Sequence, residues 1–188
     1  MKKKALLMMI ICALFSMSLF SAPLLQLGAN ASYNALIADE AFSDGFKEIE
    51  NYTFGVEARV NLFDWVSFAV PATFGGFGGD GILITTMPSL NLNIPAADFL
   101  DIALGLGMRM DFLHSGDSWY INGTSADEAG NALMEARLAY RAALTFNLFG
   151  FGLGLTAAVP VKGSFSSFNP SPLWDASTLS ASLLINFF

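Results

Sequence analysis

The side chains best able to do chemistry in this 188-residue chain are acids and bases that stand two residues apart within apolar segments. Glu57 and Arg59 form such a pair, and Arg109 and Asp111 form another. Side chains two apart lie on one face of a β-strand, where opposite charges can form salt bridges. With these two pairs, nine charged residues are expected on the inward-facing polar side of such strands: Glu57, Arg59, Asp101, Arg109, Asp111, Glu135, Arg137, Arg141 and Lys162. They comprise four acids and five bases, so we expect them to neutralise one another within one enclosed network.

The only histidine, His114, is the one candidate for acid–base catalysis. Asp111, Ser115, Asp117 and Ser118 are close to it in the sequence. Acyl transfer needs a nucleophile, a base within hydrogen-bond reach and a third group that orients the base. Polar loops bring such residues together by accident, and a lone histidine in a loop is usually solvated. We therefore predict no enzyme, and keep an acyl-transfer site at His114 as the alternative.

Metal and cofactor sites are not predicted. A single cysteine, Cys12, and a single histidine exclude cysteine-based zinc sites and most histidine-based ones. The acidic residues between positions 39 and 50 are a candidate for calcium binding, but they lack the regular spacing of a calcium loop. We expect a solvated acidic loop there.

The composition indicates a membrane protein. The chain is 54% hydrophobic and 13% charged, whereas soluble domains carry about 25% charged residues. The net charge of −7 and the lack of a basic cluster after Lys2, Lys3 and Lys4 exclude nucleic acid as a partner. After residue 22 there is no second uninterrupted apolar run of about 20 residues, so a polytopic helical protein is excluded.

The first 22 residues have the layout of a secretory signal peptide. Three lysines precede an uncharged stretch that ends in small residues, including Ser21 and Ala22. An uncleaved transmembrane anchor is the alternative, because the uncharged stretch is close to the length that spans a bilayer. We expect residues 1–22 to be a signal peptide and residues 23–188 to be the mature domain.

The mature chain alternates between apolar and polar residues with the period of a β-strand. The clearest case is Leu100–Phe112, where large apolar side chains alternate with glycine, alanine and charged residues. Pro71, Pro88 and Pro160 lie inside alternating segments and predict bulges or early strand ends. We predict eight strands: Leu25–Asn34, Asn51–Leu62, Val66–Phe74, Ile82–Ile94, Leu100–Phe112, Met134–Asn147, Phe149–Val161 and Ala176–Phe187.

The connections and strand ends support an up-and-down barrel. Connections two, four and six are short, whereas one, five and seven are long, as in transmembrane β-barrels. Every even-numbered strand ends in an asparagine between two apolar residues: Asn61, Asn93, Asn147 and Asn186. These four predict one recurring position at the periplasmic rim. The alternative, given equal weight, is a polar residue wherever a strand meets water.

The two faces of the strands decide which side of the barrel meets lipid. The polar face carries small residues and all four arginines, whereas the other face carries large side chains that would overfill an eight-stranded interior. We therefore expect the large apolar side chains outside, with a soluble barrel of apolar interior as the alternative. Aromatic residues near the short connections predict an interfacial girdle: Phe63, Trp65, Phe99, Phe149, Phe151 and Phe187.

Together these features resemble the small eight-stranded outer-membrane barrels of Gram-negative-type bacteria, including the membrane domain of outer-membrane protein A and the outer-membrane protein W family. The resemblance covers Leu24–Phe188 and rests on the signal peptide, strand count, alternation and terminal Asn186-Phe187-Phe188. Phe188 matches the common terminal phenylalanine, whereas Asn186 replaces the aromatic or apolar residue often found there. The resemblance implies an all-β, antiparallel up-and-down transmembrane barrel in a bacterial outer membrane. It also implies contacts with membrane lipids and with the barrel-insertion machinery.

The resemblance is weak for function, because such barrels include channels, adhesins, anchors and enzymes. We expect a non-enzymatic barrel with a structural, surface-interaction or small-solute passage role, the solute being hydrophobic. Aromatic residues in the long loops, such as Trp119, Tyr120 and Trp174, are candidates for contact with an external ligand or host surface.

Two placements inside the barrel are predicted. A hairpin closed near residue 123 sets Arg141 opposite Gly105, and Glu57 is then the acid best placed to meet Arg141 across the lumen. The same hairpin brings Asp111 and Glu135 near Arg109 and Arg137. We favour a salt-bridged plug over a selectivity filter for this network.

Overall fold

The computed structural model describes residues 23–34, 49–75, 81–122, 124–125, 129–148 and 150–187. The predicted signal peptide, residues 1–22, lies outside this range, and so do most of the acidic stretch between 39 and 50, Phe149 and Phe188. In the described part of the chain, no helix is both long and apolar enough to cross a membrane.

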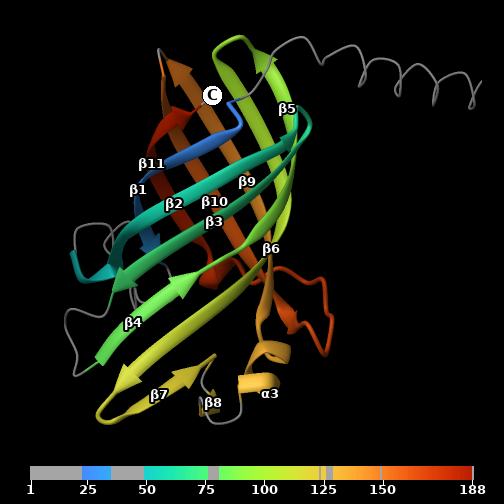
Figure 1. The fold of residues 1–188 in the computed structure, drawn as a ribbon. Helices are drawn as coiled ribbons and strands as arrows, with labels where there is room; N and C mark the ends of the chain where they lie inside the picture. Colours follow the sequence, from blue (N-terminus) through green and yellow to red (C-terminus); the bar gives the residue numbers. More distant parts are fainter. Residues whose placement is uncertain are drawn as a thin grey trace, which may run out of the picture.

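The strands form a closed antiparallel ring that winds obliquely around the barrel axis (Figure 1). The ring closes where β1 pairs with β11 over the whole length of both strands, from Leu25 opposite Phe187 to Asn34 opposite Thr178. In chain order its members are β1 (Leu25–Asn34), β2 (Tyr52–Phe63), β3 (Val66–Gly75), β4 (Gly81–Thr86) with β5 (Ser89–Ala97), β6 (Leu100–Ser115), β9 (Arg137–Leu148), β10 (Phe151–Ser164) and β11 (Thr178–Phe187). The predicted eight-stranded all-β barrel is confirmed.

The fourth strand position is occupied by two strands instead of the single strand predicted over 82–94. β4 pairs with the end of β3 and the far end of β6, whereas β5 pairs with the start of each. Met87 and Pro88 separate them, since proline cannot donate to the ladder. The Met87 N–H still donates to the Pro71 carbonyl at 3.2 Å, so the wall stays closed at the break.

The long connection after β6 contains structure that the sequence did not predict. β6 runs on to Ser115, beyond the predicted end at Phe112, and pairs with β7 (Ser118–Ile121), which pairs with β8 (Thr124–Ser125). A short helix, α3 (Ala129–Met134), follows. The strand predicted from Met134 therefore begins at Arg137, and Ala136, expected on the outer face, is fully buried. These elements extend one end of the barrel (Figure 1).

Two of the three prolines act as predicted. Pro88 ends β4, and Pro160 precedes a bulge at which the register jumps from Pro160 opposite Ala139 to Ser164 opposite Arg137. Pro71, in contrast, sits in regular register opposite Glu57. Its carbonyl accepts hydrogen bonds from the Met87 N–H, at the break between β4 and β5, and from the Thr86 hydroxyl.

Along most strands of the ring, burial follows the predicted two-residue period, whereas the short strand β4 does not alternate. On β6, Leu104 is 49% exposed and Ala103 only 4% exposed, so the large side chain faces outward and the small one faces the lumen. Small and polar residues fill the narrow interior, as in other eight-stranded barrels. The remaining short elements are two 3-10 turns, Ile49–Asn51 and Trp174–Ala176.

Candidate functional site: a charged plug in the barrel lumen

The centre of the lumen is occupied by one carboxylate that binds two guanidinium groups. Oε1 of Glu57 on β2 lies 2.9 Å from Nη2 of Arg141 on β9 and 3.0 Å from Nη2 of Arg59. Oε2 accepts hydrogen bonds from Asn30 on β1, at 3.3 Å, and from the Ser182 hydroxyl on β11. Both oxygens are thus fully used, and the Glu57–Arg141 contact across the barrel is the one expected from the sequence. We call Glu57, Arg59 and Arg141 the central cluster.

Arg141 reaches this position because the strand beside it carries no side chain there. Its register partner on β6 is Gly105, as the hairpin geometry predicted. A Cβ at Gly105 would lie 2.9 Å from the Asn91 Cα and would also overlap the Leu90 carbonyl, so that only glycine fits. The guanidinium also donates to Asn91 on β5, at 3.2 Å, and to Thr156 on β10, at 3.3 Å.

The central cluster is buried, and its hydrogen bonds connect most strands of the barrel wall. Glu57 is 1% exposed, Arg59 4% and Arg141 3%. Its polar partners were not singled out from the sequence, although each stands on the polar face of its strand: Asn30, Asn91, Thr145, Thr156 and Ser182. Together these residues connect β1, β2, β5, β9, β10 and β11. Two guanidiniums against one carboxylate leave one positive charge in excess, which hydroxyl and amide oxygens stabilise.

A second layer of side chains inside the lumen is apolar and was not predicted. Met87, at the break between β4 and β5, packs with Ala139 of β9 and Ala158 of β10, and all three are buried. Gly107 makes room for it, because a Cβ there would lie 2.9 Å from the Met87 Cγ. The signal in the sequence was Pro88, which marked the break but did not show that it turns Met87 inward.

Beyond this layer, toward the long loops, Arg109 and Asp111 form the next charged pair. The Arg109 Nε lies 3.1 and 3.0 Å from the two Asp111 oxygens, and the Thr85 hydroxyl donates to Asp111 at 2.7 Å. Asn122, whose φ is +50°, accepts from the Asp111 N–H at 2.9 Å. This pair is bound to the wall on both sides and stands apart from the central cluster.

Three of the nine predicted network residues lie at the mouth of the barrel instead of deep in the lumen. Glu135, Arg137 and Lys162 are exposed, and none of them forms an ion pair with another described residue. Glu135 lies after α3 and before β9, and the bulge of β10 displaces Lys162 from the ladder. Of the expected contacts across this hairpin, Arg109 and Asp111 form an ion pair, whereas Glu135 forms none with Arg109 or Arg137 among the described residues. Arg137 faces Arg109 across the ladder.

At the opposite end, the four predicted asparagines occupy equivalent positions. The backbone N–H of each donates, over 2.8–2.9 Å, to the carbonyl of the residue directly before a neighbouring strand: Leu24, Trp65, Phe99 and Gly150. Asn93 donates to Asn61 at 3.2 Å, and Asn186 donates to Asn147 at 3.4 Å. Asn147 also donates to Asp101 at 2.6 Å, which places the ninth predicted residue, Asp101, in this rim.

The histidine is not arranged for acyl transfer. The two-residue period places His114 on the opposite face of β6 from Asp111, and its ring packs against Trp119 at a centroid distance of 4.8 Å. In the described part of the chain, it forms no hydrogen bond with Asp111, Ser115, Asp117 or Ser118. The described residues also contain no group of three His, Cys, Asp or Glu side chains that could hold a metal ion.

No family model matches the chain, and no curated protein matches it. Among solved structures it is similar to Ail, the attachment invasion locus protein of Yersinia pestis, with TM-score 0.50, 17% identity, and coverage of 87% of this chain and 95% of that one. Ail in complex with the heparin analogue sucrose octasulfate gives TM-score 0.49, 17% identity and the same coverage. The N-terminal β-barrel domain of Pseudomonas aeruginosa OprF gives TM-score 0.49, 11% identity, and coverage of 87% and 96%. The likeness to Ail confirms the predicted fold, a small antiparallel β-barrel.

Proposed function

We propose that this protein is a non-enzymatic barrel of a bacterial outer membrane that keeps its own lumen closed and presents its long-loop end outside the cell. The outer surface supports the membrane setting, because its exposed side chains are large and apolar. Leu92 and Leu106 are 57% and 60% exposed at mid-strand positions. Exposed aromatic rings near the short turns fit an interfacial girdle, and Phe63 and Trp65 stack there at 5.8 Å.

The central cluster is the observation that carries the closed-lumen proposal. Three charged side chains that are at most 4% exposed fill the lumen at mid-height, and Met87 adds an apolar layer next to them. A selectivity filter needs a ring of ligands around a continuous aqueous path. Here the charged groups bind one another directly, so that passage of a small solute is disfavoured and a structural or surface-interaction role is favoured.

The proposal includes an orientation and a processing step. Residues 1–22 act as a cleaved signal peptide, and the barrel end at which Leu25 of β1 pairs with Phe187 of β11 lies in the periplasm. The asparagine rim is then periplasmic. The extended end built from β7, β8 and α3 is then extracellular, where it meets an external ligand or host surface.

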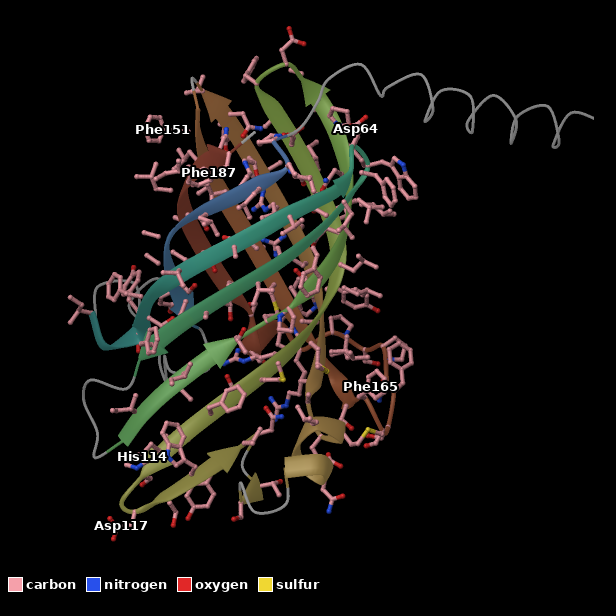
Figure 2. All side chains as sticks on the ribbon, in the orientation of Figure 1. Asp64, His114, Asp117, Phe151, Phe165 and Phe187 are labelled. Atoms are coloured by element: carbon pink, nitrogen blue, oxygen red, sulfur yellow. The ribbon has the colours of Figure 1, made fainter. Side chains whose placement is uncertain are left out.

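Labelling of intact cells tests the orientation. Figure 2 shows Asp117 and Asp64 at opposite ends of the barrel. Cys12 lies within the proposed signal peptide, so the mature chain carries no cysteine of its own. A membrane-impermeant maleimide should label Asp117→Cys on intact cells and label Asp64→Cys only after lysis. Labelling of Asp64→Cys on intact cells with Asp117→Cys protected would reverse the orientation, and recovery of both in the soluble fraction would overturn the membrane assignment.

Liposome swelling tests the closed lumen. Proteoliposomes that contain the wild-type barrel should swell in a small sugar no faster than protein-free liposomes. Swelling that rises with the amount of folded wild-type protein would favour solute passage over the role proposed here.

A further inference from the structure

A cavity at the long-loop mouth has the composition of a binding site and is independent of the plug. Its volume is about 570 Å³, within the range of small-molecule sites. Its lining is strongly polar: Asn122, Thr124, Glu135, Arg137, Lys162, Gly163, Ser164 and Ser167. Three separate segments contribute to it, namely the β7–β8 turn, the link from α3 to β9, and the bulge of β10.

The bulge that carries Lys162 is a fixed structure. The Lys162 N–H donates to the Ser171 carbonyl at 2.9 Å, and the Gly163 N–H donates to Asn169 at 3.3 Å. A Cβ on Gly163 would overlap the backbone of residues 167–169, which therefore packs directly against it. The Ser164 hydroxyl lies 2.9 and 3.0 Å from those of Ser166 and Ser167. This segment holds one ammonium and several hydroxyls at the cavity wall.

The charges around the cavity do not satisfy one another. Arg137 and Lys162 stand against one acid, Glu135, and no pair among the three comes within salt-bridge distance. Like charges directly opposite each other on a ladder destabilise a sheet. Arg137 nevertheless faces Arg109, which forms its ion pair with Asp111. The described residues that line the cavity therefore carry one positive charge in excess, although the whole chain has a net charge of −7.

We propose that this cavity binds a phosphate or sulfate ester of a sugar or small polyol. Arg137 and Lys162 hold the anionic group, which relieves the Arg137–Arg109 repulsion. Glu135 accepts hydrogen bonds from the ligand hydroxyls, and the hydroxyls of Thr124 and the serines donate hydrogen bonds to them or accept hydrogen bonds from them. Arg137 occupies the lumen-facing register of β9, in line with Arg141. The ligand is therefore expected on the lumen side of β9, and it arrives from solution, not from the lipid-facing wall. This inference goes beyond the proposed function, which does not depend on it.

Calorimetric titration of the folded barrel in detergent micelles tests the proposal, with glucose 6-phosphate as the probe. Inorganic phosphate and glucose serve as the two half-ligands. We expect one-to-one binding of glucose 6-phosphate, weaker binding of phosphate and no detectable binding of glucose. Lys162→Gln and Arg137→Gln should each weaken glucose 6-phosphate binding about tenfold, the loss of one charge-assisted hydrogen bond.

Glu135→Gln is the matched control, because it removes a charge of opposite sign from the same cavity. It should bind inorganic phosphate at least as tightly as the wild type. Gel mobility before and after boiling confirms that each variant is folded. No binding of glucose 6-phosphate to the folded wild type, or unchanged binding in both cation variants, would overturn the proposal. Equal affinity for phosphate and glucose 6-phosphate would overturn its sugar component. None of these outcomes tests the closed-lumen proposal, which is tested separately by solute flux into liposomes.

Discussion

Removal of the Glu57 carboxylate should destabilise the barrel more than removal of either arginine that it binds. Glu57 accepts from two guanidiniums through one oxygen, at 2.9 and 3.0 Å. In Arg141→Gln, the carboxylate keeps Arg59, Asn30 and Ser182 as partners. In Glu57→Gln, two buried guanidiniums are left facing each other with no acid between them.

The magnitudes follow from this asymmetry. Breaking a buried ion pair by removing one partner costs about 3–5 kcal/mol. We expect about 3 kcal/mol for Arg141→Gln, because Glu57 stays neutralised, and about 5 kcal/mol for Glu57→Gln. In the double variant, the two costs should not add, since only Arg59 then remains charged in the central cluster. Glu135→Gln, an exposed acid with no ion pair among the described residues, should change stability by less than about 0.5 kcal/mol.

Urea unfolding of the folded barrel in micelles, followed by tryptophan fluorescence, measures these free energies. The expected loss of unfolding free energy increases from Glu135→Gln to Arg141→Gln to Glu57→Gln. If Glu57→Gln proved no more destabilising than Arg141→Gln, the carboxylate would not be the hub of the cluster and the reasoning would fail.

Two further predictions concern the faces of the wall and the room inside it. Leu104→Arg should destabilise the inserted barrel by about 2–4 kcal/mol, as an arginine does at the bilayer midplane, whereas Ala103→Ser should be nearly neutral in the same urea titration. Similar effects of the two would show that the faces are wrongly assigned. Gly105→Ala should impair folding, because its Cβ would strike the backbone of Asn91. Gly154→Ala should fold normally, because its Cβ would lie 3.5 Å from its nearest neighbour, an ordinary contact distance. Folding is measured by the difference in gel mobility between boiled and unboiled samples.

The wall of the barrel could be predicted because a single rule governs it. Alternation of large apolar and small polar residues fixes the strand period and the faces, as at Leu104 and Ala103. Once the hairpin between β6 and β9 is placed, its register fixes Arg141 opposite Gly105. Glu57 is then identified as the partner of Arg141, because it lies at a similar depth in the barrel and a narrow barrel lets side chains from opposite walls meet.

The parts that could not be predicted depend on local departures from this rule. Pro88 signalled a break, but the inward turn of Met87 depends on space left by Gly107 and by alanines on two other strands. The alternating pattern predicts that Lys162 faces the lumen, but the bulge after Pro160 places it at the mouth of the barrel. The period likewise continues through Met134, where a short helix forms instead.

The mouth cavity was missed for the same reason. Glu135, Arg137 and Lys162 were assigned to one neutral network, because strand periodicity placed them on the inner face. Their separation arises from α3, from the hairpin of β7 and β8, and from the bulge of β10. All of these are long-loop features whose positions depend on tertiary contacts and not on an alternating pattern.

Ionic conductance across planar bilayers tests the central claim, a lumen closed by two layers, most directly. The wild-type barrel should give no steady channels. Arg141→Ala and Met87→Ala should each stay largely closed, because the other layer remains, while the double variant should conduct. Stable ohmic channels from the folded wild-type protein, or a double variant as silent as the wild type, would contradict the account.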